Sequence, residues 1–114
     1  FRELIEGLFP VGPDGVITLR ENEYFKVQEV PECKGHIYTN FTPALERVVP
    51  RATDQRSLKQ VHFDFAASVQ AVTEEIGVAF ARAAIELTGI RNLALAGGVG
   101  LNGLMNEQIR RKSG

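Results

Sequence analysis

The sequence contains one cysteine, Cys33, and no tryptophan. A lone cysteine excludes an internal disulfide framework and suits a reducing compartment. No apolar run approaches the roughly 20 residues that a membrane-spanning helix needs, and no charged and then apolar leader opens the chain. We therefore expect a cytoplasmic protein with no membrane partner.

Charge of either sign is not in excess, because 13 Lys and Arg residues are balanced by 14 Asp and Glu residues. This balance gives no general attraction to nucleic acid, so we expect no nucleic-acid partner and only local recognition of anions. The 114 residues, 44% of them hydrophobic, allow at most one domain with a modest core. The chain opens on Phe1 in helical rhythm rather than on Met, so we interpret residues 1–114 as a piece of a longer protein.

Helical spacing is the clearest pattern that is present. From Ser57 to Thr88, apolar residues recur three or four positions apart, which predicts one long helix that Gly89 ends in the left-handed conformation. The apolar stripe consists of Phe65, Val69, Val72, Ile76, Phe80, Ala83 and Leu87. Shorter helices are predicted over residues 4–8, 43–48 and 101–109.

Short apolar runs predict strands. The run Leu93–Ala96 predicts a buried strand, and Val16–Leu19 with Glu23–Val27 predicts a small N-terminal β-hairpin. A further short strand is allowed over His36–Thr39. Helix, buried strand, glycine turn and helix, in this order, are typical of an α/β layered fold.

The predicted strand Leu93–Ala96 leads into a cluster of glycines and one asparagine. The G-x-G-x-x-G pattern of dinucleotide-binding turns, where bare backbone approaches phosphate, is matched by Gly98-Val99-Gly100-Leu101-Asn102-Gly103. Asn102 adds an amide that can donate to and accept from a ribose hydroxyl or a base edge. The turn therefore predicts either a nucleoside-phosphate site or a tight connection in which Asn102 caps the following helix.

Two segments carry a resemblance to a known family. The first reads Leu93-Ala94-Leu95-Ala96-Gly97-Gly98-Val99-Gly100-Leu101-Asn102, followed by Asn106, and the second reads His62-x-Asp64-Phe65-Ala66-Ala67-Ser68-Val69-Gln70. They are similar to the Leu-x-Leu-Ala-Gly-Gly-Val-Ala-Leu-Asn-x-x-x-Asn signature and the His-x-Asp-Ile-Ala-Ala-Ser-Val-Gln helix of the NodU/CmcH-type O-carbamoyltransferases, a nodulation-protein-like family. Gly100 and Gly103 stand where the family usually has Ala and Cys, which leaves the contact positions intact.

The resemblance implies that residues 1–114 are a partial carbamoyltransferase domain of the TsaD-like type, with an actin-like ATPase fold of two RNase H-like halves. It implies transfer of a carbamoyl group from carbamoyl phosphate, through a carbamoyl-adenylate made with ATP, to a hydroxyl of a sugar-type acceptor. The nucleotide contacts carry over to Gly97, Gly98, Val99 and Asn102.

The same resemblance places no catalytic residue in this chain. The family's divalent metal is held by a His-x-x-x-His pair and a later Asp, and these would lie outside the fragment. We therefore expect the isolated chain to be inactive. A partial domain also leaves apolar surface uncovered, so we expect it to self-associate.

Two residue pairs resemble catalytic or metal sites more weakly. Cys33 and His36 have a metal-like spacing, but one such pair without a second is typical of a loop. His62 and Asp64 could form an acid–base pair. At the start of a helix, however, a capping role for His62 and a favourable dipole interaction for Asp64 are preferred.

The remaining polar candidates have structural explanations. Ser68 lacks the nucleophile elbow that would expose and activate it. Glu74 and Glu75 are interpreted as a solvated helix face, and the basic run 110–112 as a favourable helix end.

Other functions remain open from the sequence. One is another actin-like nucleotide enzyme, such as a tRNA threonylcarbamoyl transferase or a sugar kinase. A Rossmann-type oxidoreductase would bind NAD rather than ATP. A non-catalytic assembly module would use the glycine turn only to pack a helix onto a strand.

Overall fold

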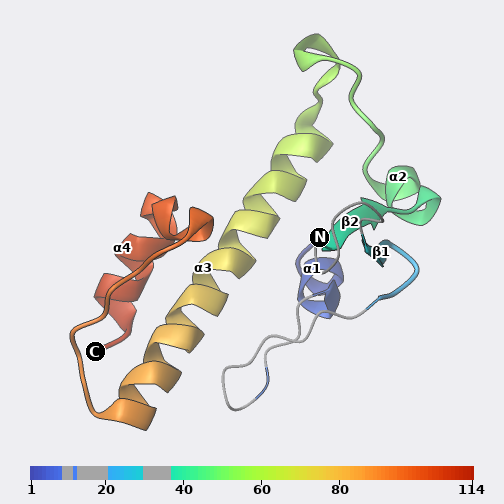
Figure 1. Cartoon of the computed structure of the whole chain (residues 1–114). Helices are drawn as coiled ribbons and strands as arrows, with labels where there is room; N and C mark the ends of the chain where they lie inside the picture. Colours follow the sequence, from blue (N-terminus) through green and yellow to red (C-terminus); the bar gives the residue numbers. More distant parts are fainter. Residues whose placement is uncertain (9–11, 13–20, 30–36) are drawn as a thin grey trace.

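The computed structural model describes residues 1–8, 12, 21–29 and 37–114. Helices account for most of this part of the chain (Figure 1). The elements in chain order are α1 (Arg2–Leu8), β1 (Phe25–Glu29), β2 (Ile37–Phe41), α2 (Pro43–Val48), the 3-10 helix η1 (Gln55–Ser57), α3 (Gln60–Thr88), the 3-10 helix η2 (Gly98–Leu101) and α4 (Gly103–Lys112).

The long helix predicted from the apolar stripe is confirmed as α3, a helix of 29 residues. It begins where the Lys59 backbone N–H donates to Nδ1 of His62 at 2.8 Å. It ends at Gly89, whose φ of 70° is the predicted left-handed stop, with its N–H donating to the Ile85 carbonyl at 2.7 Å. The start lies three residues later than predicted, because residues 55–57 form η1 instead.

Helix α4 lies alongside the C-terminal half of α3 (Figure 1). Their contact forms the main buried cluster, which consists of Val78, Ala81, Met105 and Ile109. At its far end, the Arg82 guanidinium of α3 donates to the Lys112 carbonyl at 2.9 Å. The two helices are therefore joined by apolar packing and by a polar contact.

Gly77 allows this close approach of α3 and α4. A Cβ atom at Gly77 would lie 2.6 Å from Cγ and 2.8 Å from Sδ of Met105. It would also lie 3.3 Å from Cδ1 of Ile109. These separations leave no room for a methyl group unless Met105 moves.

The N-terminal helix α1 contacts α3 on a side away from α4 (Figure 1). Ile5 of α1 is 1% exposed, and the Phe1 ring meets the Phe65 ring edge-to-face with centroids 5.6 Å apart. The Arg2 guanidinium pairs with the Glu75 carboxylate at 2.7 Å. Glu75 therefore has a specific partner, which the interpretation as a purely solvated face missed.

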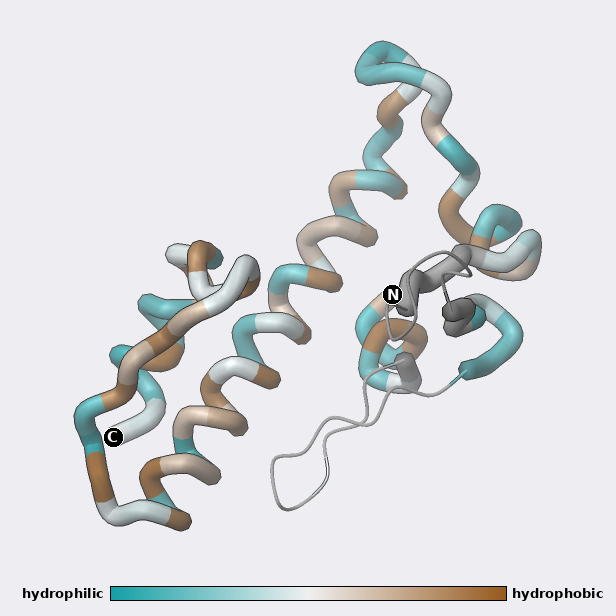
Figure 2. The backbone as a smooth tube through the Cα atoms, in the orientation of Figure 1, coloured by the Kyte–Doolittle hydropathy of each residue, from teal (hydrophilic) through white to brown (hydrophobic). Residues whose placement is uncertain are grey.

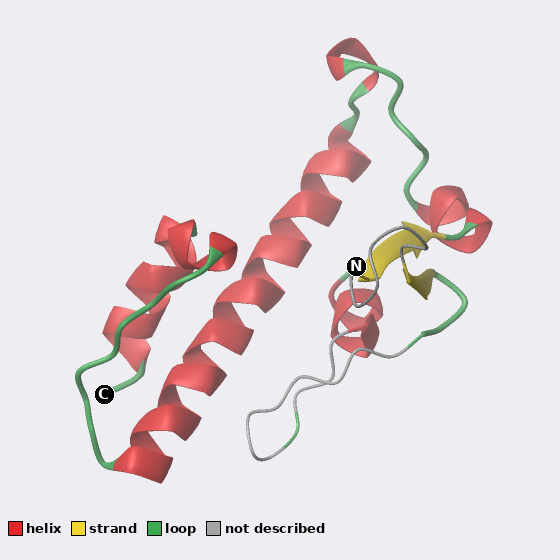
Figure 3. Cartoon of the chain, in the orientation of Figure 1, coloured by secondary structure: helices red, strands yellow, loops and turns green. Residues whose placement is uncertain are grey.

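The sheet in the described part of the chain is a two-stranded antiparallel hairpin (Figure 3). Its register runs from Phe25 opposite Phe41 to Glu29 opposite Ile37. The predicted hairpin instead used Val16–Leu19, which lies outside the described residues. The hairpin joins α2 through Thr42, whose backbone N–H donates to the Tyr24 carbonyl at 3.2 Å.

The predicted α/β fold, with an actin-like domain built on a buried strand, is wrong for this structure. Leu93–Ala96 is extended, but it is not paired with any described strand. Leu93 and Leu95 are also 37% and 48% exposed, so the segment is not buried. An apolar run shows that a segment could join a sheet, but a strand needs a neighbour to accept its backbone hydrogen bonds. The described residues supply helices beside it instead.

No helix in the described residues combines the length and apolar character needed to cross a membrane. Hydrophobic residues nevertheless recur along α3 and through the segment that returns beside it (Figure 2). Along α3 these residues alternate with charged and polar ones, as is typical of an amphipathic helix.

Gly77→Ala should destabilise the 114-residue chain by about 1–3 kcal/mol, because the added methyl group overpacks the contact with Met105. The matched control is Gly7→Ala in α1, where a Cβ would meet nothing within 4 Å. That change should leave stability equal or slightly higher, since alanine favours a helix over glycine. Chemical denaturation measures both, and equal stability of the Gly77→Ala and wild-type chains would contradict the close contact.

Acid should weaken the last turn of α4. Hydrogen bonds from Arg110 and then Arg111 lower the pKa of Glu107 to about 2 from its usual 4.5. A carboxylate whose pKa is depressed on folding stabilises the fold above its usual pKa, and this contribution disappears as the pH falls from 4.5 to about 2.

The helical circular dichroism signal of the wild-type chain should therefore decline in that window. The Glu107→Gln chain should lose this component of the decline, whereas Glu86→Gln, an exposed change on α3, should keep it. High salt should reduce the wild-type effect. Identical acid titrations of the wild-type and Glu107→Gln chains would refute this role of the ion pairs.

Candidate functional site

The glycine turn follows the extended segment that runs back from the end of α3 (Figure 1). Gly97 has φ 88° and ψ 172°, a backbone conformation that residues other than glycine rarely adopt. Its carbonyl accepts from the Gly100 N–H at 3.0 Å and begins η2. Gly97 is therefore required by the backbone path of the turn itself.

Gly98 has no such requirement in the described structure. Its φ is not positive, and a Cβ built there would meet nothing within 4 Å. Val99, the next residue, is 63% exposed. The turn thus presents backbone with open space beside Gly98, where a ligand could approach.

Asn102 is the N-cap of α4. Its Oδ1 accepts from the Met105 backbone N–H at 3.1 Å, so the capping alternative for this residue is confirmed. The same side chain also meets Gln70 of α3 through two hydrogen bonds, of 3.1 and 2.9 Å. A nucleotide contact at Asn102 would therefore have to coexist with these interactions.

Asn106 lies one helical turn after Asn102 in α4 and holds the glycine turn in place. Its Nδ2 donates to the Gly100 carbonyl at 2.8 Å, and its backbone N–H donates to the Asn102 carbonyl at 3.0 Å. Its Oδ1 is buried and has no hydrogen-bond partner among the described residues. The turn is thus bound to α4 on one side and to α3 on the other.

The four residues predicted to contact nucleotide are brought together in one turn, as their sequence order requires. Sequence reasoning did not assign a role to Gln70, although the residue lies within the family-like segment of α3. A glutamine 32 positions away gives no local signal for pairing with Asn102. The contact depends on how α3 and α4 pack.

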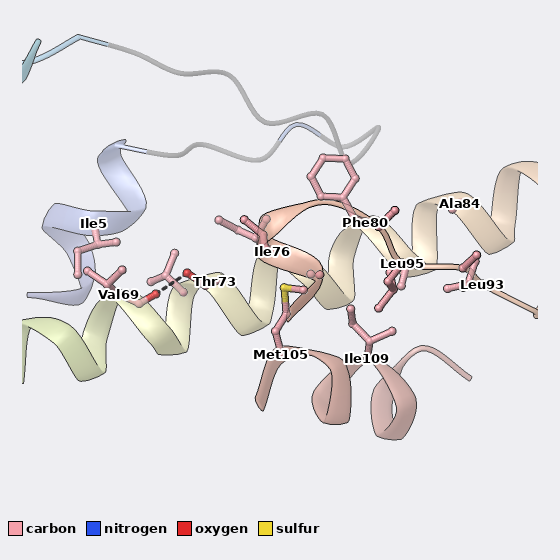
Figure 4. A pocket seen from close by; sticks show the side chains of 17 residues that line it. Ile5, Val69, Thr73, Ile76, Phe80, Ala84, Leu93, Leu95, Met105 and Ile109 are labelled. Atoms are coloured by element: carbon pink, nitrogen blue, oxygen red, sulfur yellow. Dashed lines mark hydrogen bonds between the residues drawn. The ribbon is translucent and has the colours of Figure 1, made fainter. Parts of the chain in front are cut away.

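A hollow of about 550 Å³ lies beside the turn, between α3, the segment 93–100 and α4 (Figure 4). Among the described residues, Thr73 is the one polar side chain that lines it, and its hydroxyl donates to the Val69 carbonyl at 2.8 Å. Val99 and Gly100 contribute to the lining, but Gly97, Gly98 and Asn102 do not. An apolar hollow of this kind suits packing, not the binding of phosphate.

His62 and Asp64 do not form an acid–base pair in the structure. Nδ1 of His62 accepts from the Lys59 N–H, and Nε2 donates to the Pro50 carbonyl at 2.7 Å. Asp64 accepts from the Gln60 amide at 2.8 Å. The predicted capping role of His62 is confirmed.

The remaining candidates for catalysis or metal binding either have a structural role or lie outside the described residues. The Ser68 hydroxyl donates to the Asp64 carbonyl at 2.7 Å, within α3. Cys33 and His36 lie outside the described residues. Within the residues that the structure describes, no three His, Cys, Asp or Glu side chains gather as a metal site would require.

The sequence model of a protein family, described as the carbamoyltransferase N-terminus, matches residues 14–114 of this chain. The chain belongs to this family. The match confirms the resemblance to carbamoyltransferases that was carried by the turn and by α3. It also covers β1, β2 and α2.

Two relatives are similar to this chain over part of its length. An uncharacterized protein of Synechocystis sp. is 40% identical over 63 residues, which are 55% of this chain and 10% of that protein. A tRNA N6-adenosine threonylcarbamoyltransferase of Bordetella pertussis is 39% identical over 71 residues, 61% of this chain and 20% of the relative. The chain thus spans a small part of each relative. No solved structure matches it.

Substitutions at Asn106 should separate a lost hydrogen bond from an unfavourable buried charge. Asn106→Asp removes the donor to the Gly100 carbonyl and places carboxylate oxygens there, which should cost about 2–3 kcal/mol of stability. Asn106→Leu also loses the bond but removes the unpartnered Oδ1, so it should cost about 1 kcal/mol. Chemical denaturation of the 114-residue chain compares them, and a larger loss for leucine than for aspartate would contradict this account.

Proposed function

We propose that the protein to which this chain belongs is an ATP-dependent O-carbamoyltransferase. It would take the carbamoyl group from carbamoyl phosphate, pass it through a carbamoyl-adenylate, and transfer it to a hydroxyl of a sugar-type acceptor. Membership in the carbamoyltransferase N-terminus family over residues 14–114 supports carbamoyl transfer. The acceptor and the use of ATP are part of the proposal.

The observation that carries the nucleotide part is the open glycine turn. Gly98 does not have a positive φ, and a Cβ built there would meet nothing within 4 Å, so packing among the described residues gives no reason for a bare backbone there. The turn leads directly into the N-terminus of α4, where backbone N–H groups and the helix dipole favour an anionic or polar ligand. We assign Gly97, Gly98, Val99 and Asn102 to one side of the nucleotide site.

This side supplies binding, and the reaction needs further groups. The turn contains no side chain that could act as an acid, a base or a nucleophile. We therefore propose that the divalent metal and the catalytic groups are held by residues outside this chain. On this account the isolated chain is inactive, and the carbamoyl acceptor binds elsewhere in the whole protein.

The second candidate is transfer of a threonylcarbamoyl group to tRNA. The similarity to the Bordetella pertussis tRNA N6-adenosine threonylcarbamoyltransferase favours it. The near-neutral net charge of −1 gives this chain no general attraction to the tRNA backbone. Two assays of the whole protein, both with ATP present, distinguish the reactions. The first supplies carbamoyl phosphate and a sugar, and the second supplies threonylcarbamoyl-adenylate and tRNA.

In the whole protein, Asn102→Ala should weaken ATP binding by about 1–2 kcal/mol, the scale of a lost polar pairing. The alanine also removes the cap of α4, so Asn102→Ser is the matched variant, because serine caps a helix but lacks the amide. Calorimetric titration with ATP should show weaker binding for both. Gly98→Val should weaken binding further, since a branched side chain fills the open space beside the turn. Unchanged ATP affinity in all three variants would refute the assignment.

A further inference from the structure

Gln70 of α3 and Asn102 at the start of α4 form a reciprocal pair of amides. Nε2 of Gln70 donates to Oδ1 of Asn102 at 3.1 Å, and Nδ2 of Asn102 donates to Oε1 of Gln70 at 2.9 Å. The two residues are 32 positions apart, and the pair is partly buried. It is a direct side-chain connection between α3 and the turn.

Each amide of this pair makes one further hydrogen bond, and these two bonds fix how both amides are oriented. An amide can usually be turned over to exchange its oxygen and nitrogen. Here, Nε2 of Gln70 also donates to the Glu74 carboxylate at 2.9 Å, and a carboxylate can only accept. At the other end, Oδ1 of Asn102 accepts from the Met105 N–H, which can only donate. Turning over either amide would break a bond at its end.

A count of the Asn102 amide shows what is left for a ligand. A side-chain amide has two N–H donors and two acceptor positions on its oxygen. Met105 and Gln70 donate to Oδ1, and Nδ2 donates to Gln70. Among the described residues, this leaves one N–H of Nδ2 without a partner and no free acceptor position on Oδ1. The sequence-based expectation that Asn102 both donates and accepts is therefore narrowed to donation.

We propose that Gln70 is a positioning residue that sets the Asn102 amide, so that Asn102 offers the nucleotide a single N–H donor. The nucleotide atom that it meets would then be an acceptor, such as a ribose oxygen, a base ring nitrogen or a phosphate oxygen. This inference rests on the proposed nucleotide site at the turn. It assigns Gln70 a role that acts through Asn102 and involves no contact with the ligand.

The capping role of Asn102 does not explain the pairing. A cap needs only a side-chain oxygen that accepts from the first turn, which serine, threonine and aspartate also supply. The amide nitrogen adds nothing to the cap, yet it is held in place from a different helix. Orientation of the nitrogen is what Gln70 contributes.

The test is a double-mutant cycle in the whole protein, with ATP as the titrant. Gln70→Met keeps the length of the side chain and removes both hydrogen bonds to Asn102, while the cap on Met105 is retained. The ATP dissociation constant should rise about threefold to tenfold, the range for one oriented hydrogen bond. In a protein that already carries Asn102→Ser, Gln70→Met should cause little further change, because the two residues act together.

Gln60→Met is the matched control, since Gln60 lies on the same helix and pairs with Asp64 instead. It should leave the ATP dissociation constant unchanged. Gln70→Glu is a second variant that keeps an acceptor for Nδ2 of Asn102 but loses both donors, and it should also weaken ATP binding. Thermal unfolding of each variant confirms that the proteins compared are folded.

The outcomes separate this inference from the proposed function. If the wild-type protein does not bind ATP, the nucleotide site and the role of Gln70 both fall. If it binds ATP and Gln70→Met behaves like Gln60→Met, the role of Gln70 alone is refuted. Additive effects of Gln70→Met and Asn102→Ser would also refute it, because Gln70 would then act independently of Asn102.

Discussion

The close contact of α3 and α4 at Gly77 is the constraint on which the rest of the C-terminal half depends. Because no Cβ separates the helices there, Met105 and Ile109 pack directly against the α3 backbone. Met105 lies three residues after Asn102, so the contact that buries Met105 also limits the distance from α3 to Asn102, the N-cap of α4. The amide pair of Gln70 and Asn102 joins the same two helices about two turns of α3 away from Gly77. Apolar packing thereby controls polar geometry at the turn.

Different parts of the chain could be predicted for different physical reasons. The apolar stripe and Gly89 predicted α3 and its end because helical spacing and a left-handed stop are local properties. Leu93–Ala96 was wrongly predicted as a buried strand, since strand formation depends on a partner that a local pattern cannot reveal. The hairpin illustrates the same limit, because β1 pairs with residues 37–41.

The candidate site divides in the same way. The position of the glycine turn and the capping ability of Asn102 could be read from neighbouring residues in the sequence. Its pairing with Gln70 could not, because it arises from two helices joined by a long connection. The fold also changes the hydrogen-bonding capacity of the Asn102 amide. In isolation Asn102 can donate and accept, but in the fold its oxygen is fully used.

The distribution of charge limits what the turn could do for a triphosphate. The basic side chains of α4 lie in its last turn, about 10–15 Å along the helix from Asn102. Arg110 and Arg111 are there paired with Glu107 at 2.7 and 2.6 Å. Among the described residues at the turn itself, positive potential comes from the backbone N–H groups, the helix dipole and the Asn102 N–H that has no partner there. Such dipoles select and orient a ligand, but they do not neutralise several phosphate charges. A nucleotide bound here would therefore need cations besides the groups that the turn and α4 supply, with the turn holding its position and those cations neutralising the charge.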